Sequence, residues 1–220
     1  MMSQNFIAFI DVLGFAEMVS SDCNNPSQKF DALFSLIDVM KQIVDIIDDE
    51  PEVGFMQFSD SIVLSAPFNR EKFGYFLSLC QKLQKILLQK RILCRGGVAV
   101  GRHYSSQNFV FSEGLIEAYR LESTAARHPR IVVSENLLDL ISYPLNKHQT
   151  EFLVKDRDGI WFVDYLDHDT QKSAFEMYEY FWNALSYNIS ASLRDKYLWM
   201  IDYIKFSYPE RDFAVPVFKK

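Results

Sequence analysis

A continuous apolar segment near the N-terminus is the feature that most constrains the fold of this chain. Residues 5–10 read Asn-Phe-Ile-Ala-Phe-Ile, and a short run of this kind is typical of a central β-strand that is covered on both faces. Asp11 follows directly, and Gly14 comes soon after. We expect the strand to end at Asp11, at the edge of the sheet where open α/β proteins bind their ligands.

Helices and further strands alternate after this segment. Apolar residues recur every three or four positions over 30–47 and 72–89, which predicts two amphipathic helices. Strands at 53–58 and 61–66 are separated only by Ser59-Asp60, which predicts a tight hairpin. Further strands are expected at 92–100, 109–111, 130–133, 151–154 and 159–165, a helix at 114–127, and two aromatic-rich helices from Gln171 onward. This order predicts an α/β (α+β) fold, with a domain over 1–168 and a helical C-terminal appendage over 169–220.

Composition and charge exclude several classes of protein. Of the 220 residues, 49% are hydrophobic, so the chain can bury a core and is not intrinsically disordered. A net charge of −6 argues against a nucleic-acid-binding protein, which needs a basic surface. No segment is long and apolar enough to span a membrane, and the N-terminus lacks the features of a secretory signal. We therefore expect a cytoplasmic protein that binds neither nucleic acid nor membrane.

Cysteine, histidine and glycine residues form no familiar site motif. The three cysteines include no C-x-x-C pair, and the four histidines show no zinc-binding spacing, so neither a disulfide framework nor a zinc site is expected. Cys94 lies in an apolar strand and is interpreted as a core residue rather than a nucleophile. Gly96-Gly97 is not followed by Gly-Lys-Ser/Thr, so it is not a phosphate-binding P-loop.

Asp11 and Asp60 are the candidate functional residues. If the hairpin lies beside the first strand, the carboxylates at the strand end and at the hairpin tip converge. Two carboxylates at close range repel each other, so a site that holds them together usually also holds a divalent cation. Their hard oxygen atoms favour Mg²⁺ or Mn²⁺, which typically serve phosphate groups. Taken singly, Asp11 also fits a helix cap and Asp60 an ordinary turn residue.

Four motifs in order resemble class III nucleotidyl cyclases over roughly residues 5–165. They are FIDVLGF at 9–15, FSDSI at 58–62, RGGVAVG at 95–101, and the pair FSEGLI at 111–116 and AYRLES at 118–123. The motif FSDSI resembles a metal motif of that family that usually reads Gly-Asp. The motif RGGVAVG resembles the family's Arg-x-Gly-x-x-x-Gly strand. The resemblance implies a ferredoxin-type sheet with flanking helices.

The resemblance also implies a site and an activity. Asp11, Asp60 and the backbone carbonyl of Val12 would hold two Mn²⁺ or Mg²⁺ ions at each site, and Arg120 would neutralise charge on the α-phosphate. In the family the aspartates and the arginine of one site come from different subunits, so a homodimer is expected. Considered alone, Arg120 is better interpreted as an exposed helix arginine paired with Glu117.

The implied substrate pocket departs from the purine-specific members of the family. Its residues are Phe15, Met56, Phe109 and Ile116. Met56 stands where purine cyclases have lysine or glutamate, and Phe109 where they have aspartate or cysteine. Neither side chain can hydrogen-bond to a purine edge. Ile116 replaces the asparagine that orients the ribose.

This pattern resembles the pyrimidine cyclases of bacterial anti-phage Pycsar systems. It implies a nucleoside triphosphate substrate, UTP in preference to CTP, and a cyclic pyrimidine nucleotide that a separate effector protein reads. Two alternatives stay open, which are a purine cyclase with an unconventional pocket and a catalytically silent cyclase-fold module that senses a nucleotide or scaffolds a partner.

Overall fold

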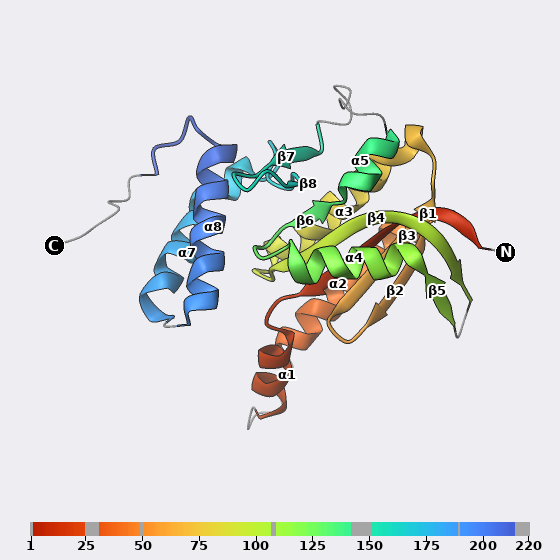
Figure 1. Cartoon of the computed structure of the whole chain (residues 1–220). Coiled ribbons are helices and arrows are strands. Elements are labelled where there is room, and N and C mark those ends of the chain that lie inside the picture. Colours follow the sequence, from red (N-terminus) through yellow and green to blue (C-terminus); the bar gives the residue numbers. More distant parts are fainter. Residues whose placement is uncertain are drawn as a thin grey trace. The chain divides into compact units, whose positions relative to one another are not determined.

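The computed structural model describes residues 2–24, 31–48, 51–106, 109–141, 151–188 and 190–213. Phe30, the first residue of a predicted helix, and residues 214–220 of the predicted appendage lie outside these ranges. The chain divides into two compact units, Met1–Tyr165 and Leu166–Lys220. The first is a mixed α/β unit built on one sheet, and the second is a pair of helices (Figure 1).

One sheet organises the first unit, and β1 lies near its middle. The strand order is β2-β3-β1-β4-β6-β8-β7, with β5 paired to β4, and the pairing is antiparallel except between β4 and β6 (Figure 1). The strands are β1 (Ser3–Val12), β2 (Gly54–Phe58), β3 (Ser61–Pro67), β4 (Cys94–Ser105), β5 (Val110–Ser112), β6 (Ile131–Val133), β7 (Leu153–Lys155) and β8 (Trp161–Val163). The apolar run at the N-terminus is therefore a central strand, as its sequence predicts, and the 54–67 hairpin lies directly beside it.

Helices cover both faces of the sheet. They are α1 (Phe15–Cys23), α2 (Asp31–Asp48), the 3₁₀ turn η1 (Arg70–Lys72), α3 (Phe73–Gln89), α4 (Glu113–Thr124) and α5 (Glu135–Ile141). The main core forms where α2, α3 and α5 pack on one face, and a smaller cluster forms where α4 packs on the other (Figure 1). Side chains of β1 alternate between the two, because successive residues of a strand point to opposite faces. Phe6 and Ile10 enter the main core, whereas Ile7 and Phe9 face α4.

Two strands extend further than their sequence predicts. β1 continues through Asp11 to Val12, because Asp11 pairs with Ser61 on β3 and with Arg95 on β4. β4 continues beyond Val100 to Ser105, because β1 and β5 supply ladder partners there. Helix α5 lies where the sequence analysis assigned no helix. Helix α1 is the helix for which Asp11 is considered as a cap, but its N-cap is Gly14. Cys94 is buried and burial raises the pKa of its thiol, which fits its interpretation as a core residue.

Glycines on β4 explain the Arg-x-Gly-x-x-x-Gly pattern physically. Gly97 and Gly101 lie on the face of β4 that α4 covers, the same face as Arg95. A methyl group at Gly97 would lie 2.3 Å from the carbonyl oxygen of Ala118 on α4, and one at Gly101 would lie 2.4 Å from the backbone nitrogen of Gly114. The helix therefore rests directly on the strand backbone at these two positions.

Replacing Gly97 by Ala is expected to lower the free energy of unfolding by about 1–3 kcal/mol, since the added methyl group must displace a helix backbone. Urea denaturation measures the change. Gly54→Ala is the matched control, because its nearest neighbour is the movable hydroxyl of Ser65. If both substitutions lower the free energy of unfolding equally, the close helix–strand packing at Gly97 does not account for the loss of stability.

The second unit consists of the 3₁₀ turn η2 (Gln171–Ser173) and helices α7 (Ala174–Tyr187) and α8 (Ala191–Ser207). Aromatic side chains form much of its interior, as the sequence predicts, and they include Tyr178, Phe181, Trp199 and Tyr203. None of the helices in the described ranges has the length and apolar character needed to cross a bilayer.

Candidate active site

Asp11 and the hairpin tip are held together at one end of β1. Asp11 lies opposite Ser61, so Asp60 comes one residue beyond the last pair of the β1–β3 ladder. The backbone N–H of Val12 donates to the carbonyl oxygen of Asp60 at 2.8 Å, which closes this end of the sheet. The structure thus brings together the three residues that the resemblance implies for a metal site.

The hairpin reaches this position through a strained turn residue. Ser59 has φ of +54°, in the left-handed region that favours glycine. This conformation gives a physical reason for the Gly-Asp that the resembling motif usually carries at 59–60. The side chain of Gln57 supports the turn by donating to the carbonyl oxygen of Ser59 at 2.6 Å.

Arg95 and Glu122 complete the cluster, although sequence reasoning gave neither a role. Arg95 Nε donates to Asp11 Oδ2 at 3.3 Å and lies 2.7 Å from Glu122 Oε1. The Glu122 side chain is only 4% exposed. A signal for it does exist in the sequence, because Gly114, Ala118 and Glu122 follow a four-residue spacing along the buried side of α4.

Burial and charge act against each other at these carboxyl groups. Burial raises the pKa of Asp11, Arg95 lowers it, and the negative charge of Asp60 raises it again. Burial also raises the pKa of Glu122, Arg95 lowers it, and Asp11 and Asp60 add to the rise. Arg95 contacts two of these carboxyl groups and the charge of Asp60 acts on both, so the cluster has an excess of negative charge that favours a bound cation.

The donor atoms suit a hard divalent cation such as Mg²⁺ or Mn²⁺. Within the described ranges, no group of three or more His, Cys, Asp or Glu side chains is arranged to enclose a metal by itself. A cation at Asp11 and Asp60 would therefore take further ligands from water and from a bound phosphate, as Mg²⁺ commonly does. The residues present fit a hard cation that takes part of its coordination from water or from a bound ligand.

Arg120 lies away from this cluster in its own chain. Glu122 faces the sheet, and two residues correspond to about 200° around a helix, so Arg120 points outward. Its side chain is 70% exposed and lies 3.8 Å from Glu117. Across the described part of the chain, Arg120 makes no hydrogen bond or ion pair with Asp11 or Asp60.

The implied substrate-pocket residues fall into two places. Met56 is half-buried in a small cavity between the sheet and the start of α4. Phe109 and Ile116 lie on the nearby surface, 62% and 56% exposed. Phe15, at the start of α1, instead packs against the main core on the other face of the sheet.

Several large apolar side chains are exposed on β4, on α4, and on β5 or just before it. They are Tyr104, Phe109, Phe111, Ile116 and Tyr119, and each is at least 39% exposed. Exposed aromatic and aliphatic groups in such number on neighbouring elements are characteristic of a surface that another molecule covers.

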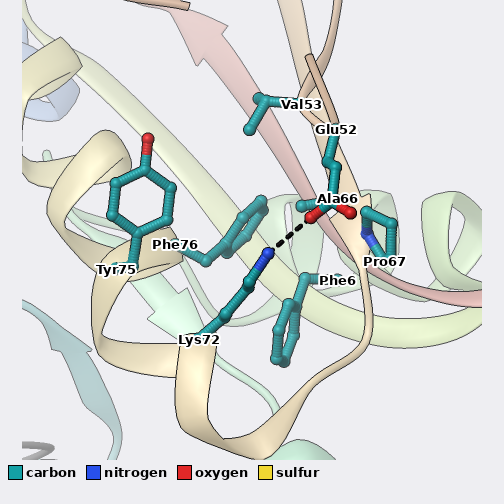
Figure 2. A pocket seen from close by; sticks show the side chains of 8 residues that line it. All are labelled: Phe6, Glu52, Val53, Ala66, Pro67, Lys72, Tyr75 and Phe76. Carbon is teal, nitrogen blue, oxygen red and sulfur yellow. Dashed lines mark hydrogen bonds and ion pairs between the residues drawn. The ribbon is translucent and has the colours of Figure 1, made fainter. Parts of the chain in front are cut away.

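A further cavity of about 240 Å³ lies on the main-core face of the sheet. Figure 2 shows aromatic rings of Phe6, Tyr75 and Phe76 around it. Its two charged lining groups, Lys72 and Glu52, lie 2.5 Å apart and neutralise each other (Figure 2). It lacks the excess of charge that distinguishes the Asp11 cluster.

Comparison with known proteins identifies the fold. No family profile and no curated protein matches the chain. It is similar to a class III adenylyl cyclase-like ATP-binding protein from Pseudomonas aeruginosa, with a TM-score of 0.52, 10% identity, and 79% of this chain and 40% of that chain covered. It is also similar to the catalytic core of a rhodopsin-guanylyl cyclase of converted specificity in complex with ATPαS, with a TM-score of 0.50 and 13% identity. That match covers 74% of this chain and 96% of the cyclase core.

A third similar structure is the non-canonical dimeric guanylyl cyclase domain of a fusion protein from the aquatic fungus Blastocladiella emersonii, with a TM-score of 0.50 and 14% identity. That match covers 73% of this chain and 94% of the fungal domain. At such identities the likeness establishes architecture and not activity. The chain is a mixed α/β protein whose central sheet and flanking helices have the fold of class III nucleotidyl cyclase catalytic domains.

Proposed function

We propose that this chain is a nucleotidyl cyclase that depends on a divalent metal. The observation that carries the proposal is the meeting of Asp11 and Asp60 at the end of β1, in a cluster with an excess of carboxylates. Asp11, Asp60 and the Val12 carbonyl would hold two Mg²⁺ or Mn²⁺ ions. When bound, such ions lower the pKa of the ribose 3′-hydroxyl and hold the triphosphate.

The reaction forms one P–O bond and breaks another. The 3′-hydroxyl gives up its proton to solvent, its oxygen attacks the α-phosphorus in line, the bond from that phosphorus to the bridging oxygen breaks, and pyrophosphate leaves. Arg95 positions Asp11 through their hydrogen bond. Arg120 of the partner subunit donates to the oxygens of the α-phosphate, a role that suits the fork of a guanidinium group.

A head-to-tail homodimer is part of the proposal. Arg120 points away from the aspartates of its own chain, so it can serve a site only in another. The exposed apolar groups of β4, β5 and α4 supply a surface that a second subunit could cover. Twofold symmetry would then give two equivalent sites in each dimer.

We propose a pyrimidine nucleoside triphosphate as the substrate, with UTP ahead of CTP. Met56 lines the small cavity with an apolar side chain, and Phe109 offers no hydrogen bond to a base. The product would be a cyclic pyrimidine nucleotide that a separate effector protein reads in defence against phage, as the resemblance to Pycsar cyclases implies.

The test of the activity and the base preference is to incubate the protein with each ribonucleoside triphosphate and Mn²⁺, and to identify products by mass spectrometry. We expect kcat/KM for UTP or CTP to exceed the values for ATP and GTP at least about tenfold, since unpaired polar groups on a base discriminate strongly. Equal turnover of purines would contradict the base preference and leave the cyclase proposal standing.

One observation favours a second candidate, a nucleotide-binding module without turnover. The Asp11–Arg95 contact places a guanidinium of the chain itself beside a carboxylate that the metal would need. If that ion pair holds in the presence of nucleotide and Mn²⁺, triphosphates would bind and be released unchanged. The same incubation separates the two candidates, because only the enzyme yields a cyclic product.

A further inference from the structure

His103 is a buried polar residue that the proposed reaction does not use. It lies on β4, opposite Ser3 of β1 and Ser112 of β5, and is 6% exposed. Neither ring nitrogen has a hydrogen-bond partner within the described ranges. Most buried polar groups in folded proteins are paired, so an imidazole with two unpaired nitrogens needs a specific explanation.

The imidazole borders the same cavity as Met56. The cavity has a volume of about 40 Å³. Its walls are apolar at Met56, Val110 and Leu115, and they carry polar side chains at Ser65, Ser105 and His103. A space of this size holds a few solvent-sized atoms, so it can receive the edge of a ring but not a whole nucleotide.

The chemistry of the cavity suits an uncharged polar ligand. Burial lowers the pKa of His103, so its ring is neutral at pH 7 and offers one donor and one acceptor. None of the residues that line the cavity is lysine, arginine, aspartate or glutamate. A phosphate group would need positive charge here, whereas the edge of a nucleobase needs only hydrogen-bond partners in an apolar surrounding.

We propose that His103 reads the edge of the substrate's nucleobase in this cavity, and that it supplies the hydrogen bonding that Met56 and Phe109 cannot. The inference rests on the proposed function, because it takes a nucleoside triphosphate as the ligand. The small space between His103 and Met56 receives the edge of one ring, which the proposed pyrimidine substrate presents. His103 is thus a specificity-determining residue and takes no part in bond breaking.

The test compares three variants by their kcat/KM for all four ribonucleoside triphosphates. His103→Leu should lower kcat/KM for the preferred substrate about 10- to 100-fold, because the hydrogen bond to the base is lost. This kcat/KM should then be close to the values for the other three nucleoside triphosphates. His103→Gln keeps a donor and an acceptor and should restore part of the preference. His168→Leu is the matched control, since that histidine is exposed and lies in the second unit.

A second measurement does not depend on a variant that folds or on turnover. The ring signals of His103 in the wild-type protein, followed by NMR, should shift when UTP or CTP is added with Mg²⁺. The signals of His168 should stay unchanged. If the ring signals do not respond, or if His103→Leu leaves the ratio of kcat/KM values unchanged, the inference is wrong.

The two proposals fail in different ways. Cyclic product with unchanged base selectivity in His103→Leu, or wild-type enzyme with no selectivity, overturns the role of His103 and leaves the cyclase intact. A nucleotide-dependent shift of the His103 signals without any cyclic product overturns the cyclase and supports the base-binding role.

Discussion

Replacing Asp11 or Asp60 by Asn is expected to lower the formation of cyclic nucleotide at least about 100-fold. Each substitution keeps the size of the side chain and removes one negative charge from the cluster that would hold the cation. The fold should persist, because Asn is well tolerated in turns and Asp11 keeps its backbone pairs with Ser61 and Arg95.

Product assays at saturating Mn²⁺, with thermal unfolding of each variant, provide the measurement. Asp38→Asn is the matched control, since that carboxylate is exposed on α2 and pairs only loosely with Lys41 at 3.9 Å. We expect it to keep wild-type activity. Substantial turnover by folded Asp11→Asn or Asp60→Asn protein would remove the basis of the metal-site assignment.

Mixing two inactive variants is expected to restore about a quarter of wild-type activity. Asp11→Ala and Arg120→Ala proteins should each be inactive alone, because every site in either homodimer lacks one group. After subunit exchange at equal concentrations, half of the dimers are heterodimers, and each has one intact site and one doubly damaged site. If the two sites of a dimer act independently, the mixture then has about a quarter of wild-type activity.

Exchange itself is checked by native mass spectrometry of the mixed proteins. Glu117→Ala is the control for the helix surface, since it removes the neighbour of Arg120 and leaves the guanidinium in place. It should retain activity. If heterodimers form and the mixture stays inactive, the shared site is ruled out, and Arg120 has no role across the interface.

The elements of the fold that could be predicted are mostly those that depend on local sequence patterns. The apolar run at 5–10, the two-residue turn at Ser59-Asp60 and the helical periodicity of α2 and α3 each depend on neighbouring residues alone. The hairpin tip at Asp60 was predictable for the same reason, but its meeting with Asp11 is predicted only on the condition that the hairpin lies beside the first strand, as it does in the structure.

The contacts that cross from β4 to α4 could not be predicted in this way. Arg95 meets Glu122 only because Gly97 and Gly101 let the helix rest on the strand, and that closeness depends on tertiary packing. The sequence gives no signal for His103, because it forms no metal-binding motif and the predicted strand ends at Val100. Its burial beneath α4 requires the additional ladder to Ser105.

The most direct test of the central claim is to measure cyclic nucleotide and pyrophosphate together, with metal present and with metal removed. Purified wild-type protein is incubated with UTP and with CTP in Mn²⁺, in excess chelator, and after Mn²⁺ is restored. We predict equal molar amounts of a 3′,5′-cyclic nucleotide and pyrophosphate in Mn²⁺, none in chelator, and recovery on restoring the metal. A linear monophosphate as the product, or cyclic product formed in excess chelator, would contradict the account.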